Sequence, residues 1–420
     1  MNTGREAAMA VLRANDRGGY TVPTARLYPF QWNWDSAFVA LGWATFDEPR
    51  AWREIERLFE GQWADGMLPH IVFHAASDDY FPGPDVWGVT HQPATSGITQ
   101  PPVVASAVFR LWRAARDAGL AEARTAALYP KLLALHRWWA AARDPQGSGL
   151  VAILHPWESG MDNSPAWDLP LARVPAAPVT TIRRRDTGHV AADMRPRDED
   201  YARYVALVDL YRGENWRPEA LWRNAPFRVA DIGTNAILHR AELDLLALAG
   251  RFGAPAERAE IEARLNRARR AIAALWDAGR GLYCCYDTLA AAPIAASTSA
   301  GFLPLFSGLP GPQQAARMAR QIERWRDKAG AAVPSCDPYD ARFEARRYWR
   351  GPVWAVVNFM IADGLAVSGI APLAASIKDD TGRLIETGGF AEYFDPGSGA
   401  GAGGGTFSWT AAIALAWAQA

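Results

Sequence analysis

Apolar residues recur at helical spacing along most of the chain, which predicts an all-α protein. In the first part of the chain the pattern predicts helices over 5–16, 36–45, 49–59, 101–118 and 121–143. In the second part it predicts helices over 198–213, 231–250, 255–277, 311–327, 352–368, 371–387 and 407–418. Local signals agree, since Asp231 is a good N-cap and Pro49 suits a first helical turn. Pro130 is expected to open the helix that ends at Arg143.

The strand candidates are weak, and they include Gly149–Leu154 and Gly281–Tyr286. Short and long connections alternate between the predicted helices. This alternation favours helical hairpins arranged in a ring, an (α/α)6 toroid, with the long loops at one end. An α-solenoid is the competing architecture, but the sequence has no repeat of fixed period. No linker divides the chain, so we expect one catalytic domain over residues 1–420.

Residues 61–100 form a long segment without helical periodicity. So long a connection in a compact domain is either functional or disordered. The segment is rich in Trp, Tyr, Phe and His, which argues against disorder. We therefore expect it to contribute to a binding site.

Composition and charge narrow the range of partners. Half of the residues are hydrophobic and the formal net charge is −1, so the chain can bury a large core without attracting nucleic acid or an anionic membrane. The expected partner is therefore small or neutral, and a homo-oligomer is compatible with the sequence. The 19 tryptophans lie largely in segments broken by Gly and Pro, a distribution that favours a carbohydrate site.

Compartment signals favour the cytoplasm. Cys284 and Cys285 are neighbours and Cys336 stands alone, which is neither a disulfide framework nor a metal-binding pattern. The N-terminal residues mix charged with apolar side chains and do not resemble a signal peptide. No stretch approaches the roughly 20 apolar residues that a membrane span needs.

The segment 155–168, HPWESGMDNSPAWD, concentrates three carboxylates, two tryptophans and a histidine. Its glycine and two prolines exclude a plain helix or strand, so we predict a functional loop. A loop that mixes acids with flat aromatic faces suits a sugar, which carries both hydroxyls and apolar ring faces. We predict that Asp162 is one of two carboxyls that cleave a glycosidic bond.

A second acidic loop, residues 388–409, reads GGFAEYFDPGSGAGAGGGTFSW. Glu392 lies among three aromatic residues, a setting that raises a carboxyl pKa or places the carboxyl over a sugar. Asp395 precedes a proline and is expected to cap a turn. Glycoside hydrolysis needs two such carboxyls. Capping or an ion pair is the competing interpretation for any single aspartate in such a loop.

Other chemistries fit less well. The glycine run 397–405 lacks the GK[ST] of a phosphate loop and is expected to be a flexible connector or a lid. A metal site built from His155, Glu158 and Asp162 is disfavoured, because the glycine and proline of that segment oppose the helix that the spacing requires. A Ser-His-Asp triad has no GxSxG elbow to support it.

Seven motifs, in order, resemble those of the family 63 glycoside hydrolases, with most likeness to its bacterial mannosylglycerate and glucosylglycerate hydrolases. The motifs are YPFQWNWDS, GMLPHIVFH, YFPGPDVWG, SGITQPP, HPWESGMDNSPAWD, RRYWRGPVW and GGFAEYFDP. The resemblance implies an (α/α)6 toroid and inversion of the anomeric configuration without metal or organic cofactor. It also implies that Asp162 is the general acid and Glu392 the general base.

The resemblance further implies which residues bind the substrate. For the sugar these are Tyr28, Trp32, Trp34, Asp35, Gln100, Trp349, Arg350, Gly351 and Trp354. For the glyceryl carboxylate they are Tyr80, Tyr201, Tyr348 and Arg195, or an arginine near it. One departure is Met161, where the family pattern leads us to expect a polar or charged residue before the acid.

The predicted activity is release of glucose or mannose from a small anionic α-glycoside such as glucosylglycerate or mannosylglycerate. An α-glucosidase for neutral di- or oligosaccharides is the alternative, and a sugar-binding protein that has lost catalysis is a third. In an inverting enzyme the two carboxyls stand roughly 6.5–9.5 Å apart, which leaves room for water. Asp162 must be protonated, and burial or the nearby Glu158 and Asp168 are expected to achieve this. Glu392 must stay ionised.

Overall fold

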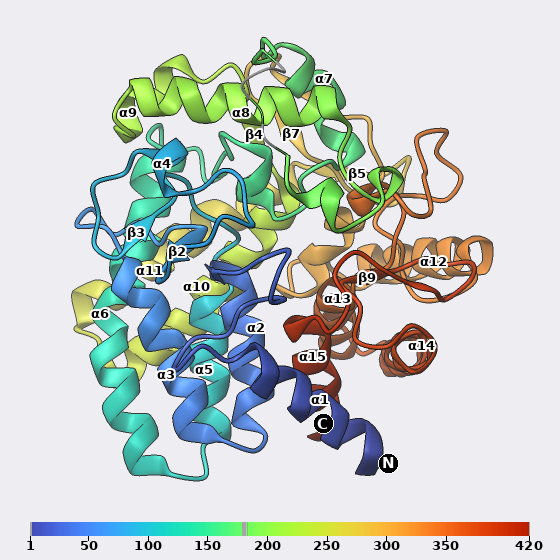
Figure 1. The fold of residues 1–420 in the computed structure, drawn as a ribbon, viewed down its shortest axis with the longest axis horizontal. Coiled ribbons are helices and arrows are strands. Elements are labelled where there is room, and N and C mark those ends of the chain that lie inside the picture. The colour runs from blue at the N-terminus through green and yellow to red at the C-terminus, as the bar shows by residue number, and fades with distance from the viewer. Residues whose placement is uncertain (1, 179–181, 183, 420) are drawn as a thin grey trace.

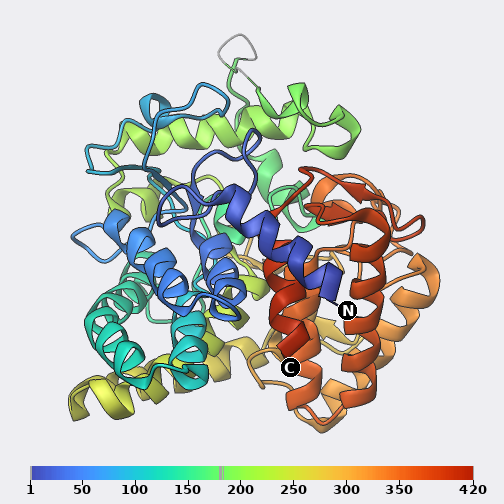
Figure 2. The same cartoon turned by 60° about the horizontal axis from the view of Figure 1, so that its bottom comes forward.

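Within residues 2–178, 182 and 184–419, which the structure describes, six helical hairpins form a closed ring (Figures 1 and 2). The structure is a computed structural model. The inner members are α2 (Asn33–Ala44), α5 (Val104–Ala114), α10 (Ile232–Phe252), η7 (Ser299–Leu305), α13 (Ala355–Val367) and α15 (Ser408–Gln419). Each packs against the next, and α15 packs against α2 to close the ring. The predicted all-α (α/α)6 toroid is confirmed.

An outer helix covers each inner member. The outer helices are α3 (Glu48–Leu58), α6 (Ala118–Arg143), α11 (Pro255–Ala273), α12 (Pro312–Ala329), α14 (Ala371–Gly388) and α1 (Asn2–Asn15). Figure 2 shows the chain passing round the ring in order, from the blue N-terminal hairpin to the red C-terminal one. The last hairpin joins the two ends of the chain, because α1 packs against α15.

Hydrophobic patterning explains which helices are inside. Nearly every residue of α13, from Ala355 to Ala362, is buried, since an inner helix is surrounded by protein. The outer helix α12 buries one stripe that includes Met318, Ile322 and Trp325, and its other face is charged. Trp325 meets Phe302 of η7 with ring centroids 4.8 Å apart, so this stripe packs onto the ring.

The inner member η7 is a short 3-10 segment that helical periodicity did not predict. Gly301 and Pro304 lie inside it and oppose a regular α-helix. The neighbouring α13 approaches it very closely at Gly364, where a Cβ atom would lie 2.3 Å from the carbonyl carbon of Leu305. The local sequence therefore favours close packing over a full helical turn.

The other predicted helices are confirmed to within a few residues. Asp231 caps α10 as predicted, accepting hydrogen bonds from the backbone N–H groups of Gly233 and Thr234. The prediction for Pro130 was wrong, because it lies inside α6 and not at a helix start. The predicted helix over 198–213 is α8 (Asp198–Gly213), which lies across one end of the ring and not in it (Figure 1). The shorter helices α7 (Asp168–Ala172) and α9 (Pro218–Asn224) lie at the same end.

The described strands are short, and antiparallel pairing joins them. One sheet has the order β1 (Gln31–Trp32), β2 (Ile71–Phe73), β3 (Ala94–Thr95), and another β4 (Val229–Ala230), β7 (Tyr286–Asp287), β8 (Ala292–Pro293). Two-stranded pairs are β5 (Trp276–Asp277) with β6 (Leu282–Tyr283) and β9 (Tyr393–Phe394) with β10 (Gly401–Ala402). Of the two predicted strand segments, 281–286 contains β6 and the start of β7. The other, 149–154, holds only an isolated bridge from Ile153 to Val229.

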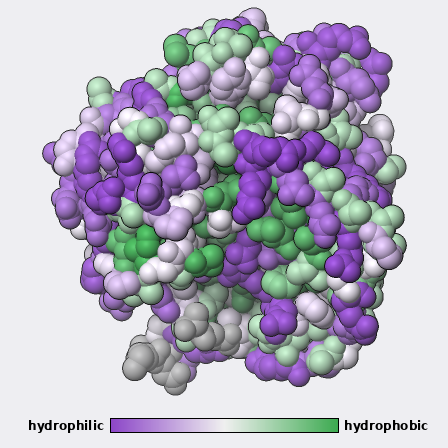
Figure 3. All heavy atoms as spheres, turned by 180° about the vertical axis from the view of Figure 1, so that it is seen from behind, coloured by the Kyte–Doolittle hydropathy of each residue, from purple (hydrophilic) through white to green (hydrophobic). Residues whose placement is uncertain are grey.

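The long loops gather at one end of the ring, as predicted. The segment 61–100 contributes β2, the short helix α4 (Pro84–Trp87) and β3 to this end. On the face seen in Figure 3, hydrophilic residues surround hydrophobic areas near the middle. No helix in the described part of the chain is long and apolar enough to cross a membrane.

Candidate active site

One cavity at the loop end brings together both predicted catalytic carboxyls and most of the predicted binding residues. Its lining includes Tyr28, Trp32, Trp34, Asp35, Tyr80, Gln100, Asp162, Arg195, Tyr201, Tyr348 and Glu392. These residues come from loops that are far apart in sequence and meet only in the closed ring. Inner helices begin here, since Asp35 lies in the first turn of α2 and Trp409 in the first turn of α15.

The loop that carries Asp162 is fixed through its backbone. It consists of two 3-10 turns, η2 (Pro156–Ser159) and η3 (Pro165–Trp167), on either side of Asp162. Gly160 has φ +67°, and a Cβ atom there would lie 2.6 Å from the ring of Trp34, so the loop requires glycine at this position. The Tyr204 hydroxyl donates to the Asp162 carbonyl at 2.8 Å.

A buried ion pair anchors the start of the same loop. Arg143 of α6 donates to Glu158 at 2.6 Å, and both side chains are buried. Glu158 also accepts the backbone N–H of Leu154 at 2.7 Å. Glu158 therefore holds the loop to the ring. Its charge is neutralised by Arg143 and is not among the causes that raise the pKa of Asp162.

Burial raises the pKa of Asp162 to about 7. The positive charge of Arg195 opposes this rise, and the negative charges of Glu392 and Asp186 add to it. The predicted direction of the shift is confirmed, because burial raises the pKa of Asp162. The predicted help from Glu158 and Asp168 was wrong, because each of these carboxylates is paired with an arginine.

Glu392 is equally buried but receives several hydrogen bonds. The Tyr28 hydroxyl donates to its Oε1 at 3.0 Å, and the backbone N–H of Gly404 donates to its Oε2 at 3.0 Å. Arg195 Nη1 lies 3.8 Å from Oε1. Burial raises the pKa of Glu392, while the charge of Arg195 and these donors lower it by stabilising the carboxylate.

The end of the glycine run 397–405 is part of this site. Glu392 and Gly404 exchange hydrogen bonds, because the Glu392 N–H also donates to the Gly404 carbonyl at 2.8 Å. Gly403 has φ +71°, and a Cβ atom there would lie 2.3 Å from Glu392 Oε2. The run thus places backbone against the carboxylate where no side chain would fit. Asp395 caps a turn as predicted, accepting the N–H groups of Gly397 and Ser398.

Asp35 is the third buried carboxyl of the cavity. Burial raises its pKa well above the usual value, and the negative charges of Glu392 and Asp162 raise it further. Gln100, which was also predicted, lies beside it and accepts the backbone N–H of Trp34 at 3.3 Å. Three acids therefore share one cavity and influence one another's protonation.

Arg195 is the buried cation among these acids. Its Nε donates to Asp186 at 2.9 Å, and its Nη1 donates to the Tyr28 hydroxyl at 2.8 Å. Its guanidinium also lies 4.2 Å from the ring centroid of Tyr348. Burial alone would raise the pKa of Asp186, but the charges of Arg195 and Arg184 hold that pKa below its usual range. Among the arginines considered for the aglycone, Arg185 and Arg195 line the cavity, and of these two only Arg195 is buried. Arg183 lies outside the described residues.

The three predicted tyrosines line the cavity beside Arg195. The hydroxyls of Tyr348 and Tyr28 lie 3.0 Å apart, and the Tyr201 hydroxyl donates to the Phe81 carbonyl at 2.7 Å. Tyr348 has φ +46°, a strained conformation for a bulky residue. Such strain is common at functional sites, where surrounding contacts hold a side chain in place.

Four predicted binding residues do not line the cavity: Trp349, Arg350, Gly351 and Trp354. Trp349 and Trp354 stack on each other with ring centroids 3.7 Å apart. Trp354 also packs against Trp409, whose ring forms part of the lining. The two tryptophans therefore pack behind the lining residues of the cavity wall. The family pattern alone did not distinguish residues that line the cavity from residues that pack behind its lining.

The cavity also includes residues to which the sequence analysis assigned no individual role. Among them are His70, Trp157, Gly160, Asp186, Phe407 and Trp409. Burial lowers the pKa of His70 well below its usual value, so the ring is neutral, and its Nδ1 lies 2.8 Å from Ser96 Oγ. The one available signal for Asp186 was its position directly after a run of arginines.

The described residues contain no group of three or more His, Cys, Asp or Glu side chains placed to hold a metal ion. Two members of the metal site considered from sequence have other partners. His155 lies with Nε2 3.0 Å from the Tyr204 carbonyl, and Glu158 is paired with Arg143. The site thus combines carboxyls, the arginines Arg185 and Arg195 and aromatic side chains, which are groups suited to acid–base chemistry on a sugar.

Residues 28–410 match the family described as the mannosylglycerate hydrolase MGH1-like glycoside hydrolase domain. The mannosylglycerate hydrolase of Thermus thermophilus is 53% identical over 98% of this chain and 100% of its own length. Mannosylglycerate hydrolase MGH1 of Selaginella moellendorffii is 52% identical over 98% of this chain and 85% of its own. A crystal structure of the GH63 mannosylglycerate hydrolase from Thermus thermophilus, in complex with Tris and D-glycerate, has a TM-score of 0.95. It is 53% identical and covers 99% of this chain and 100% of that one.

Proposed function

Since the chain belongs to the family of mannosylglycerate hydrolase MGH1-like glycoside hydrolases, we propose that it cleaves the bond between a hexose and glycerate. It is a glycoside hydrolase, and its substrate class is a small anionic α-glycoside. Mannosylglycerate is the first candidate, because two relatives that are 52% and 53% identical carry that name. Glucosylglycerate is the candidate to be compared with it.

The observation that carries the mechanism is the contrast between two buried carboxyls in one cavity. Burial raises the pKa of Asp162 to about 7, so a large fraction of this group holds a proton near neutral pH. Glu392 receives hydrogen bonds from Tyr28 and Gly404, which favour its carboxylate. Asp162 is therefore suited to give a proton and Glu392 to accept one.

In the proposed reaction Asp162 donates its proton to the glycosidic oxygen while the bond from that oxygen to the anomeric carbon breaks. Glu392 takes a proton from a water molecule, whose oxygen attacks the anomeric carbon from the opposite face. The products are glycerate and a hexose of inverted anomeric configuration. The proton on Glu392 and the charge on Asp162 are then exchanged with solvent, which restores the starting state.

The remaining lining residues divide into two subsites. Asp35 and Gln100, with the faces of Trp32 and Trp34, are assigned to the hexose. Arg195 supplies the positive charge for the glycerate carboxylate, together with the hydroxyls of Tyr80, Tyr201 and Tyr348. Arg195 already donates to Asp186 and Tyr28, and it lies 3.8 Å from the Glu392 carboxylate. The same guanidinium would therefore interact with both the glycerate carboxylate and the proposed base.

Proton NMR of the first product formed tests the reaction. The α-glycosides of glycerate should release the β-anomer first, and release of the α-anomer first would contradict inversion. Mannosylglycerate and glucosylglycerate should be assayed beside the neutral sugars trehalose, kojibiose and nigerose. Arg195→Ala should lower kcat/KM on the acidic substrates by more than on any neutral one, and equal losses would argue against an anionic aglycone.

The cytoplasm remains the proposed compartment, as the sequence suggested, and a homo-oligomer remains compatible with the sequence. Cell fractionation with an antibody to the chain tests the first proposal. Light scattering of the purified protein tests the second. Neither outcome changes the chemistry proposed for the cavity.

A further inference from the structure

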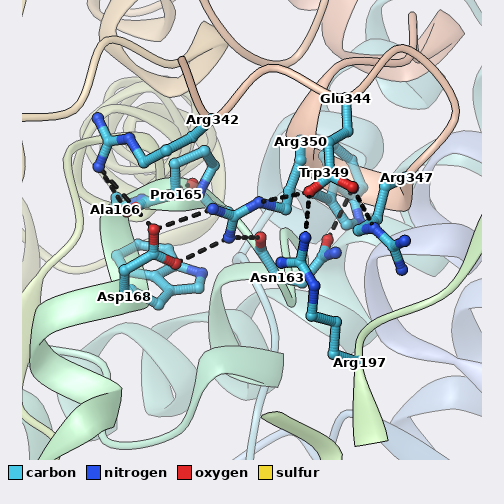
Figure 4. Close-up of polar contacts among 12 residues, drawn as sticks. Asn163, Pro165, Ala166, Asp168, Arg197, Arg342, Glu344, Arg347, Trp349 and Arg350 are labelled. Carbon is cyan, nitrogen blue, oxygen red and sulfur yellow. Dashed lines mark hydrogen bonds and ion pairs between the residues drawn. The ribbon is translucent and has the colours of Figure 1, made fainter. Parts of the chain in front are cut away.

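Arg350 and Asp168 form a two-pronged ion pair behind the wall of the cavity (Figure 4). Arg350 Nη1 donates to Asp168 Oδ1 at 2.8 Å, and Nη2 donates to Oδ2 at 2.9 Å. Arg350 ends the 3-10 turn η8 (Tyr348–Arg350), and Asp168 begins α7. The pair therefore joins the loop of the predicted acid to the YWRGPVW segment. Parallel hydrogen bonds of this kind fix orientation as well as distance.

The same turn also binds the residue directly after Asp162. Arg350 Nη1 donates to the Asn163 carbonyl at 3.3 Å, and the Trp349 N–H donates to the Asn163 side-chain oxygen at 2.8 Å. Figure 4 shows both Asn163 and Asp168 next to Arg350. The turn thus holds the acid loop at Asn163 and again at Asp168.

A second carboxylate, Glu344, lies on the other side of Arg350. Its Oε1 is 3.6 Å from Arg350 Nε and accepts a hydrogen bond from Arg197 at 2.7 Å. Arg347 pairs with the same carboxylate and donates to the Arg195 carbonyl at 3.0 Å. Arg350 is consequently held between two acids, one on the acid loop and one beside the segment that carries Arg195 (Figure 4).

We propose that Arg350 is a positioning residue for the general acid and not a ligand of the sugar. The inference rests on the proposed role of Asp162. Arg350 is only 5% exposed and is not among the residues that line the cavity, and its terminal nitrogens already bind Asp168 and Asn163. Among the described residues, the Asp162 carboxyl receives a hydrogen bond only from its own backbone N–H. Its position therefore depends on how the backbone on either side is held.

The backbone that follows Asp162 is held at two consecutive carbonyls, since Tyr204 donates to the Asp162 carbonyl and Arg350 to the Asn163 carbonyl. Loss of the Arg350 brace should displace the proton donor while leaving the water and Glu392 in place. A displacement of about 1 Å can cost roughly a hundredfold in rate. The loss of rate should appear only with substrates whose leaving group needs a proton.

Two substrates that differ in their leaving group separate this effect from a general structural one. Mannosylglycerate releases glycerate, whose departing glycosidic oxygen must be protonated, whereas α-mannosyl fluoride releases fluoride, which departs without a proton. Arg350→Lys and the milder Asp168→Asn should lower kcat on mannosylglycerate about 10- to 100-fold. Both variants should keep kcat on the fluoride within about twofold of the wild-type value, because they impair only proton donation.

Arg326→Lys is the matched control, since Arg326 forms an ion pair with Asp380 between α12 and α14, away from the lining residues. It should change neither rate, and circular dichroism should show that all variants are folded. Equal losses on both substrates, or no loss, in Arg350→Lys and Asp168→Asn would overturn the positioning role.

Asp162→Asn distinguishes failure of this inference from failure of the proposed function. If Asp162 is the acid, this variant also keeps the fluoride reaction and loses the glycoside reaction. If Asp162→Asn loses both reactions equally, the acid assignment itself is wrong. A selective loss in Asp162→Asn without one in Arg350→Lys would reject only the role of Arg350.

Discussion

The loops of Asp162 and Glu392 hold carboxyls of similar burial in opposite ways. The Glu392 loop supports the carboxylate itself, through Tyr28 and Gly404. The Asp162 loop is held through its backbone and its flanking residues, and the described residues give the Asp162 carboxyl only its own N–H as a donor. The group proposed to release a proton is thus left without donors from other residues that would stabilise its anion. A group that must accept a proton is given several.

The largest effects should come from neutralising either carboxyl. Glu392→Gln and Asp162→Asn should each lower kcat on mannosylglycerate by about a thousandfold, within the range typical of general acid–base catalysis. They should differ in one respect. Azide is a nucleophile that attacks the anomeric carbon without help from a base, so it can restore the rate when the base is missing, but it cannot protonate the leaving group when the acid is missing. Steady-state assays with and without azide check this contrast. Rescue of Asp162→Asn and not of Glu392→Gln would reverse the two assignments.

A large effect on stability, not on chemistry, is expected from Glu158→Gln. It leaves the buried charge of Arg143 without its partner, which typically costs about 3–5 kcal/mol of the free energy of unfolding. Urea denaturation of the variant beside the wild type measures this cost. The double variant Arg143→Met with Glu158→Gln should recover part of the loss, and an unchanged midpoint in Glu158→Gln would show that the pair does not anchor the loop.

A smaller effect is expected at the glycine run. Gly403→Ala should lower kcat about tenfold, because its Cβ atom would lie 2.3 Å from Glu392 Oε2 and displace the base. Gly405→Ala is the control, since a Cβ atom there meets nothing within 4 Å. Equal rates for both variants would mean that the run acts only as a connector.

The pH profile provides the finest test of the comparison. In the proposed mechanism Asp162 acts in its protonated form, so activity should fall as the pH rises above its pKa of about 7. In the same mechanism Glu392 acts as an anion, so activity should also fall as the pH drops below its pKa, which burial raises above the usual value. The cavity titrates as a coupled set, and the two limbs report values of that set.

Arg195→Gln should move both limbs to higher pH. The charge of Arg195 lowers the pKa of Asp162 and of Glu392, so its removal raises both. The dependence of kcat on pH at saturating substrate checks this, since it separates the shift from weaker binding. A profile that keeps its position would show that Arg195 serves the aglycone alone.

Helical periodicity predicted the ring because most inner and outer helices carry clear apolar patterns and end signals. It failed at η7, where Gly301 and Pro304 break the pattern but the segment still completes the ring. No local rule reveals that a broken segment replaces a helix there. The ring contacts of η7 with α10 and α13 depend on the whole fold.

The candidate site was predicted in part from the residues and in part from the family resemblance. The acidic loops indicated Asp162 and Glu392, whereas the assignment of Trp349 and Arg350 to the sugar came from the motif alone. Spacing in a loop does not show which side chains face inward, so support and lining could not be separated. Asp186 was missed for the same reason, because its position beside Arg195 depends on distant parts of the chain.

Three inner helices, α2, α5 and α15, begin near the cavity. The lining residues Asp35 and Trp409 lie in the first turns of α2 and α15, and Gln100 lies in the segment that leads into α5. The peptide dipoles of a helix place a partial positive charge at its N-terminus. These partial positive charges lie near the cavity and favour the ionised forms of its acids. Because they are enclosed by protein, dissolved ions screen them far less than they screen surface charges. Capture of an anionic glycoside should therefore weaken only slightly as ionic strength rises.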